Sequence, residues 1–341
     1  MDTLTHALSG ALLARATTRK DAAPRSIPRR IATGFLACAA PDLDFVVSFF
    51  GPAAYVTNHR GVTHSLILLP LWALLFSWLI SKIVREPGGW RPLYGITAIA
   101  LGAHVAGDLI TSYGTMILAP FTDWRAAIGT TFIIDLWFSG IVVVGLIASA
   151  VLYRSRAPAW IALGLLVAYV GFQYAQRDKA LEFAARYAWN GAKVDAHPRP
   201  PTPFNWTVFI SDARRHEYAH INLVRDEARP YRPGDGFIAR IDSPYLPLGK
   251  ALWVTRMRYG QVDAERVREA WNSEPLAFFR HFAAEPAFDG SSEGGKCYWF
   301  VDLRFLTPGR EQMPFQFGAC RDSPDAPWRA YERSQRPGSA R

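Results

Sequence analysis

The fold class is decided by residues 157–176, which read APAWIALGLLVAYVGFQYAQ and contain no Asp, Glu, Lys or Arg. At ~1.5 Å per residue, a helix of this length crosses the ~30 Å hydrocarbon core of a bilayer. Three earlier runs, 65–81, 92–107 and 136–153, are also free of charged residues, and another, 31–58, is interrupted only by Asp42 and Asp44. We therefore predict about five membrane spans, preceded by a short, shallow helix over 3–14.

The acidic residues divide the chain at the end of this run. Of 29 Asp and Glu residues, eight lie in residues 1–176 and the other 21 follow. Beyond the division, runs rich in aromatic and β-branched residues predict strands at 204–210, 218–224, 252–259 and 298–305. Helices are expected over 178–189 and 263–272.

The expected organisation is mainly α. A polytopic transmembrane helical bundle over 1–176 precedes a soluble α+β domain over 177–320. The Pro-rich segment 197–203 is expected to be a stiff linker or turn that enters the first strand, because proline fixes φ and cannot donate to a β-ladder. The polar residues 321–341, rich in Pro, Arg and Ser, are expected to form a disordered tail.

The basic residues predict a topology. Eleven of them lie in alternate loops of the first half, whereas the remaining loops hold only Arg60 and Arg125. This positive-inside bias places the basic loops in the cytoplasm and the region after 176 in the periplasm of a multi-pass protein of the bacterial inner membrane. It also explains the net charge of +9 without nucleic acid, so the expected partner is the lipid bilayer.

The cysteines are compatible with this topology. Cys38 lies in an apolar run, and Cys297 and Cys320 fall in the polar domain. An oxidising compartment would allow the latter two to form a disulfide. Two unpaired buried thiols are the equally weighted alternative.

Ionisable residues inside the apolar segments indicate a site, because each charge at bilayer depth costs roughly 2.5–3.5 kcal/mol on insertion scales. His104 and Asp108 are four residues apart and so share one helix face. Pro41 breaks a span beside Asp42 and Asp44, and irregular backbone is tolerated there only where it lines a cavity. The candidate metal ligands are His6, Asp42, Asp44, His64, His104 and Asp108.

These side chains predict a divalent metal. Measured along the helices, they reach similar heights in the outer leaflet, as one site would require. Imidazole with carboxylate favours zinc, with manganese or iron as alternatives, over calcium or magnesium. Such a metal lowers the pKa of its water towards ~7, which is the usual basis of metal-assisted hydrolysis.

Four blocks resemble a known family. MDTLTHALSG at 1–10, PDLDF at 41–45, HRGVTHS at 59–65 and HVAGDLITSYGT at 104–115 are similar to the signature blocks of the YdjM-type inner-membrane proteins. That family is described as membrane-bound metal-dependent hydrolases. The resemblance covers the first ~150 residues and excludes the domain after 176.

The ligand order is more distantly similar to the zinc-dependent phospholipase C and P1 nuclease group. Its early His, Asp, His and His-x-x-x-Asp correspond in order to His6, to Asp42 or Asp44, to His64, and to His104 with Asp108. The resemblance implies that Asp108 bridges two metals. The further His and the His-x-x-x-Glu of that group are missing after Asp108, so one or two ions are expected rather than three.

The leading hypothesis is a membrane-bound metal-dependent hydrolase that acts on a phosphoester or another lipid-linked ester, with Asp42, His64 and Asp108 as catalytic residues. One alternative is an ion or proton transporter that uses the same buried cluster, although no two-half repeat is found. The other is a membrane-anchored partner-binding protein with a structural metal, whose coordination would be closed.

Overall fold

The computed structural model describes residues 1–19, 21, 23–308 and 313–335. The chain forms two compact units, each with its own internal contacts. The helical unit comprises Met1–Phe49 and Asn58–Ala175, and the sheet unit comprises Phe50–Thr57 and Gln176–Arg341.

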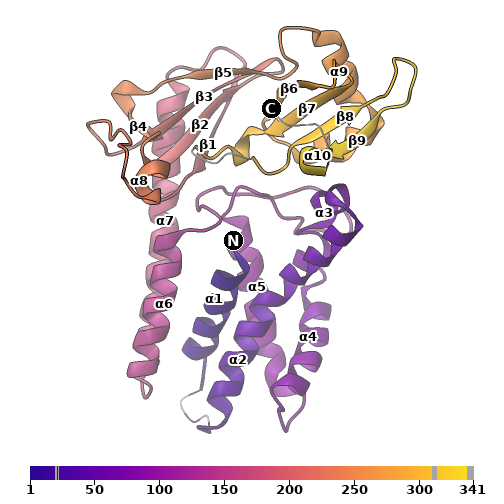
Figure 1. Ribbon diagram of the computed structural model, residues 1–341. Coiled ribbons are helices and arrows are strands. Elements are labelled where there is room, and N and C mark those ends of the chain that lie inside the picture. The colour runs from indigo at the N-terminus through magenta and orange to yellow at the C-terminus, as the bar shows by residue number, and fades with distance from the viewer. Residues whose placement is uncertain (20, 22, 309–312, 336–341) are drawn as a thin grey trace. The chain divides into compact units, whose positions relative to one another are not determined.

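The helical unit is built from antiparallel helices that run side by side (Figure 1). Its elements are α1 (Thr3–Ala16), α2 (Ser26–Ala39), the 3-10 helices η1 (Ala40–Phe50) and η2 (Val62–His64), α4 (Leu69–Ile83), α5 (Arg91–Leu109), α6 (Leu136–Val151) and the first part of α7 (Ala157–Ala185). Helix α1 packs against α2, α5 and α6, and α5 also packs against α2 and α4. Helix α1 is therefore central to the unit.

Two glycines set the closest helix crossing. A Cβ atom on Gly10 of α1 would lie 2.1 Å from the carbonyl oxygen of Gly34 in α2, and a Cβ on Gly34 would lie 2.3 Å from that of Gly10. Only a residue without a side chain fits at such a distance, and small residues at helix interfaces let backbones approach closely. This crossing holds the residues of α1 against the end of α2.

The prediction of five spans is not supported. Within the described residues, two helices are long and apolar enough to cross a membrane, Ser26–Phe50 and Ala157–Ala185, and the bent pair Pro52–His64 and Leu69–Ile83 would be a third if it forms one span. Helices α4 and α6 have only 15 and 16 residues, short of the roughly 20 that a span needs. The length of the uncharged run 65–81 overestimates the length of α4, because the run begins in a turn. In this turn the N–H of Leu66 donates to the carbonyl of Ile117.

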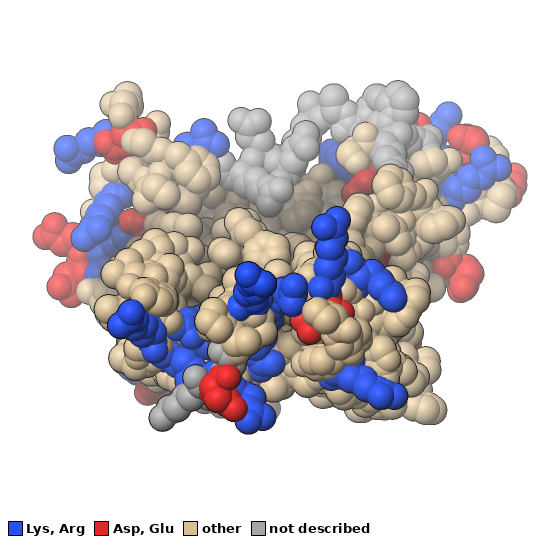
Figure 2. Space-filling model, turned by 90° about the horizontal axis from the view of Figure 1, so that it is seen from below, with Lys and Arg blue, Asp and Glu red and all other residues tan. Residues whose placement is uncertain are grey.

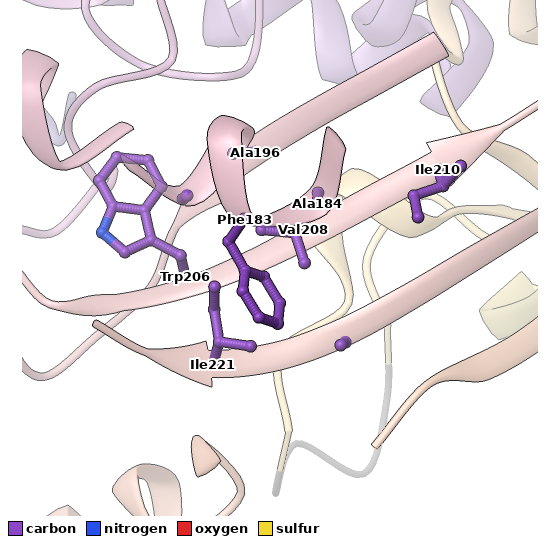
Figure 3. Close-up of a cluster of buried hydrophobic side chains, with 9 residues drawn as sticks. Phe183, Ala184, Ala196, Trp206, Val208, Ile210 and Ile221 are labelled. Carbon is purple, nitrogen blue, oxygen red and sulfur yellow. The ribbon is translucent and has the colours of Figure 1, made fainter. Parts of the chain in front are cut away.

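The sheet unit contains a five-stranded sheet of β1 (Lys193–Pro198), β2 (Asn205–Ser211), β3 (Arg215–Asn222), β4 (Leu246–Pro247) and β5 (Val254–Met257). The order is β1-β2-β3-β4, with β5 also pairing with β3. On one face, Phe183 and Ala184 of α7 lie over Trp206 and Val208 (Figure 3). Burying each large apolar side chain there stabilises the unit by roughly 1.5–3 kcal/mol.

A second sheet completes this unit, with strands β6 (Pro286–Ser292), β7 (Cys297–Asp302), β8 (Phe317–Cys320) and β9 (Arg329–Glu332) in that order. Helices α8 (Phe237–Asp242), α9 (Ala264–Asn272) and α10 (Ala277–Phe282) lie in the same unit, and most of α3 (Pro52–Asn58) also belongs to it. Cys297 and Cys320 are paired in register on β7 and β8 and form a disulfide. The open alternative of two unpaired thiols is therefore wrong in this structure.

The α+β character of the second half is confirmed, and each predicted strand overlaps an observed one. Two details were wrong. Residues 197–203 are not all linker, because His197 and Pro198 end strand β1, where Pro198 pairs with Trp206. The tail over 321–341 was expected to be disordered, yet Arg329–Glu332 forms β9, while 336–341 lie outside the described residues.

Candidate metal centre

Helix ends and 3-10 turns of the helical unit carry the candidate ligands. His104 and Asp108 lie in the last two turns of α5, on one face as predicted. Asp42 follows the end of α2, where Pro41 lacks the N–H needed to continue the helix and the chain tightens into η1. His64 ends η2. Three segments that are distant in sequence, α5, η1 and η2, therefore meet at one place.

Four of the predicted ligands form one group. Asp42, His64, His104 and Asp108 each offer one ligand atom, and these atoms all lie within 4.8 Å of one another. The Nε2 atoms of the two histidines are 2.9 Å apart. Asp108 Oδ2 lies 3.2 Å from Nε2 of His64 and 3.5 Å from Nε2 of His104. Asp42 Oδ1 lies 3.8 Å and 3.6 Å from the same two nitrogens.

The hydrogen-bond network indicates which histidine nitrogens carry protons. His104 Nδ1 is 2.6 Å from the carbonyl oxygen of Cys38, so it must donate. Thr63 donates its hydroxyl hydrogen to Asp44 Oδ2 at 3.1 Å, so its oxygen accepts from His64 Nδ1 at 2.9 Å. Each neutral imidazole therefore directs the lone pair of its Nε2 into the group.

This donor set fits a cation. Two nitrogen lone pairs and two carboxylate oxygens converge, and Asp108 Oδ2 is buried with no hydrogen-bond partner among the described residues. A tetrahedral ion with bonds of ~2.0–2.2 Å would separate its ligand atoms by roughly 3.4 Å. The separations that involve a histidine nitrogen, 2.9–3.8 Å, bracket that value, and all four ligand atoms lie within 4.8 Å of one another. Without a cation, the buried acceptors would repel one another.

The second oxygen of Asp108 is held by donors. Oδ1 forms an ion pair with Arg60 Nη2 at 2.9 Å and lies 3.0 Å from His6 Nε2, and it also contacts the α-amino group of Met1. Arg60 is itself fully buried, donates to Thr111 Oγ1 at 2.9 Å and lies over the ring of Tyr113. These contacts direct the other oxygen, Oδ2, towards the histidines.

Sequence reasoning missed Arg60, which it counted only as a loop charge. Its position between His59 and His64 was the available signal. The residue has φ +58° and its backbone N–H donates to Asp44 Oδ2 at 2.9 Å. The turn therefore places the guanidinium of Arg60 beside Asp108 and also positions His64 in the group.

His6 and Asp44 were also predicted as ligands, and the structure places both next to the group of four. The His6 ring stacks on that of His104 with centroids 3.8 Å apart, and Gly107 leaves room for it, because a Cβ there would lie 3.0 Å from His6 Cε1. His6 also forms a second possible ligand group with Cys38 and His104. Asp44 instead accepts from His59 Nδ1 at 2.7 Å, from Arg60 and from Thr63.

Two other carboxylates of the helical unit cap helices. Asp2 accepts from the N–H of Thr5 at the start of α1. Asp135 accepts from the N–H groups of Trp137 and Phe138 at the start of α6, and from the hydroxyl of Tyr169. Both have the side-chain geometry of N-caps.

Comparisons with known proteins agree with the four sequence blocks. The chain is 29% identical over 176 residues to an uncharacterized protein, YfhP, of Bacillus subtilis, and the match covers 50% of this chain and 52% of that protein. The chain thus spans about half the length of this relative. No solved structure matches. A profile of the YdjM inner membrane protein family matches residues 1–180, which is more than half of the chain, and the chain belongs to that family.

Proposed function

We propose that the helical unit is a membrane-bound metal-dependent hydrolase that acts on a phosphoester or another lipid-linked ester. The observation that carries this proposal is the convergence of four lone-pair donors on one point, with Asp108 Oδ2 buried and without a hydrogen-bond donor among the residues that the structure describes. Zinc is the expected ion, as one or two ions, with manganese or iron as alternatives.

The side chains of the metal centre have different roles in the proposed reaction. A bound divalent cation would polarise the ester and supply a nucleophile from water at neutral pH. His64, His104 and Asp108 would hold the cation, and Arg60 and His6 fix the carboxylate of Asp108. Asp42 is bound by Thr3 Oγ1 at 2.7 Å, which leaves its other oxygen directed at the histidines.

An open side supports catalysis over a structural role. The side chains of His64, His104 and Asp108 are 0% exposed, whereas that of Asp42 is 12% exposed. Structural metal sites are closed, and catalytic sites keep an accessible position. Asp42 is therefore the residue best placed to contact substrate, either as a ligand or as the base.

The surroundings of Asp42 favour a lipid-linked substrate. Leu4 beside Thr3 is 62% exposed, and Leu43 and Phe45 on either side of Asp44 are 57% and 50% exposed. Exposed apolar side chains that flank an ionisable site suit acyl chains better than a water-soluble ester.

The topology proposed with this function is multi-pass, with the sheet unit in the periplasm. The end of the helical unit that carries the loops between α1 and α2, α4 and α5, and α6 and α7 gathers Lys and Arg side chains with few acidic ones (Figure 2). Such loops remain cytoplasmic. The Cys297–Cys320 disulfide supports an oxidising compartment for the sheet unit.

Metal analysis of the detergent-purified protein and its variants tests the proposal, together with hydrolysis of aryl phosphodiester, phosphomonoester and carboxylester probes. His104→Ala and Asp108→Ala should lose bound metal and any hydrolysis, while circular dichroism shows that the helices remain. Asp123→Ala, an exposed loop carboxylate, is the control and should keep both.

Three outcomes would count against the proposal. Full metal content in both variants would refute the ligand assignment. Loss of metal together with loss of the helices would indicate a structural ion. A metal-loaded protein that hydrolyses none of the ester classes would remove the hydrolase.

A further inference from the structure

The first sheet of the sheet unit has two different faces. Ala196, Val208 and Ala219 belong to the apolar core beneath α7. Successive side chains of a strand alternate between faces, so His197 and Thr207, which are paired in register, point to the other side. Thr207 is in turn paired with His220 of β3. At this end of the strands the second face is polar, whereas Phe209 and Tyr218 on the same face belong to an apolar cluster with Ala287, Val301 and Leu303.

Arg199, directly after β1, brings a buried positive charge to this polar face. The residue is 4% exposed, and its Nε donates to Thr207 Oγ1 at 2.7 Å. Its Nη2 has no hydrogen-bond partner, and among the described residues no carboxylate lies within 4.0 Å of its guanidinium. Arginine stays protonated in proteins, and a buried unpaired charge is strongly destabilising. A negative partner is therefore missing.

Neighbouring groups add donors, and the carboxylates whose charge acts on them are paired with other arginines, Asp302 with Arg304 and Asp242 with Arg225. Because Thr207 Oγ1 accepts from Arg199, its own hydrogen donates to His220 Nδ1 at 2.9 Å. His220 therefore carries its hydrogen on Nε2, and burial together with Arg199 lowers its pKa to about 3, which keeps the ring neutral. Tyr245 packs edge-on to His220 with ring centroids 5.6 Å apart, and its buried hydroxyl has no hydrogen-bond partner within the described part of the chain.

We propose that Arg199, His220 and Tyr245 form a binding site for an oxyanion, specifically the phosphate group of a ligand. One fixed positive charge and three N–H or O–H donors come from separate segments of the chain, and a tetrahedral phosphate has enough oxygens to accept from all of them. The metal centre offers acceptor atoms to a cation, whereas this site offers donors to an anion. The proposed phosphate site depends neither on the metal nor on hydrolysis.

A route from solvent lies along the same face. Asn222 is two residues beyond His220 on β3 and so points to the same side of the sheet. It lines an open pocket of about 650 Å³ whose charged residues are two arginines and two carboxylates, Arg225, Asp226, Glu227 and Arg229. His220 itself is partly exposed. A phosphate group could therefore approach Arg199 from this pocket, whether it is free or attached to a lipid headgroup.

The test uses the full chain in detergent and follows its thermal unfolding with inorganic phosphate, with acetate, or with phosphatidic acid in mixed micelles against phosphatidylcholine. Inorganic phosphate or phosphatidic acid should raise the unfolding midpoint of the wild type in a saturable manner, because a ligand that binds only the native state stabilises it. The response to phosphatidic acid alone would identify a lipid headgroup as the source. A stronger response to acetate would refute phosphate as the ligand class.

Matched variants make the test specific. Tyr245→Phe should weaken the response at least tenfold, and Arg199→Leu should abolish it. Without added anion, Arg199→Leu should unfold at a higher temperature than the wild type, because the unpaired buried charge is gone. Arg214→Leu, at an exposed arginine, and Tyr218→Phe, on the same sheet, are controls that should respond as the wild type does.

Binding at the metal centre must be separated from binding at Arg199. Asp108→Asn should keep the full phosphate response while it loses metal, and Arg199→Leu should keep its metal. The proposal is overturned if neither phosphate nor phosphatidic acid stabilises the wild type, or if Arg199→Leu responds as strongly as the wild type. Loss of the response in Asp108→Asn would likewise assign the phosphate to the metal centre.

Discussion

The two units contain buried polar clusters of opposite character. In the helical unit, acceptor atoms of Asp42, His64 and His104 converge beside a carboxylate oxygen that has no donor. In the sheet unit, Arg199 Nη2 and the hydroxyl of Tyr245 are donors that have no acceptor among the described residues. Buried polar groups normally find partners, so each cluster indicates what it binds. Unsatisfied acceptors therefore indicate a positively charged ligand, and unsatisfied donors indicate a negatively charged one.

Gly10→Val is expected to have the largest effect, because it should disrupt the cluster of the helical unit and leave that of the sheet unit intact. A side chain on Gly10 meets the backbone of Gly34, which cannot move aside, so the cost should exceed the roughly 1–3 kcal/mol of ordinary overpacking. Metal should be lost while the phosphate response of the sheet unit remains. Gly95→Val, at a site with open space, should retain metal. Equal metal content in both variants would contradict the role of the crossing.

Removal of the disulfide should affect only the sheet unit. Cys297 and Cys320 close a loop of 23 residues, for which a cross-link is worth about 3 kcal/mol. The double Cys→Ser variant should therefore unfold at lower urea concentration and keep its bound metal. Cys38→Ala is the control for loss of a buried thiol. A change in metal content with the double variant would show that the two units are coupled.

Acid should destabilise the sheet unit through His197. Burial, reinforced by Arg199 and Arg304 and opposed by Asp195, lowers the pKa of His197 from 6.5 to about 4. The unfolded chain therefore binds a proton more readily, so stability is complete above pH 6.5 and falls as the pH drops towards 4, by about 2–3 kcal/mol. Urea unfolding across this window checks it. The slope should be shallower in His197→Gln, and an equal slope would contradict the assignment.

The smallest effect is expected from the hydrogen-bond relay behind His64. Thr63→Val removes the hydroxyl that links His64 Nδ1 to Asp44, so the ring loses its fixed tautomer. Loss of such an outer contact typically weakens metal binding about 10–100-fold. Competition with a chelator measures the affinity. Thr33→Val, whose hydroxyl bonds only to its own helix at Arg29, should bind as the wild type does.

Much of the fold could be predicted because its signals are local. Apolar runs, β-branched runs and the spacing of His104 and Asp108 each depend on one segment. Helix lengths were not predictable from uncharged runs, because residues 65–68 form a turn stabilised by Ile117, which is far away in the sequence. The same holds for β9, whose polar residues are ordered only by pairing with β8.

The sequence by itself determined that this protein has an apolar helical half with a histidine and aspartate cluster, and an α+β half with two cysteines. Only the tertiary structure decided the partners of these groups. Asp42 and Asp44 are two residues apart on the tight turn of η1, yet one faces the histidines and the other faces His59. The burial of Arg60 and Arg199 likewise depends on contacts between distant segments, and no local pattern encodes which side chains those contacts leave unsatisfied.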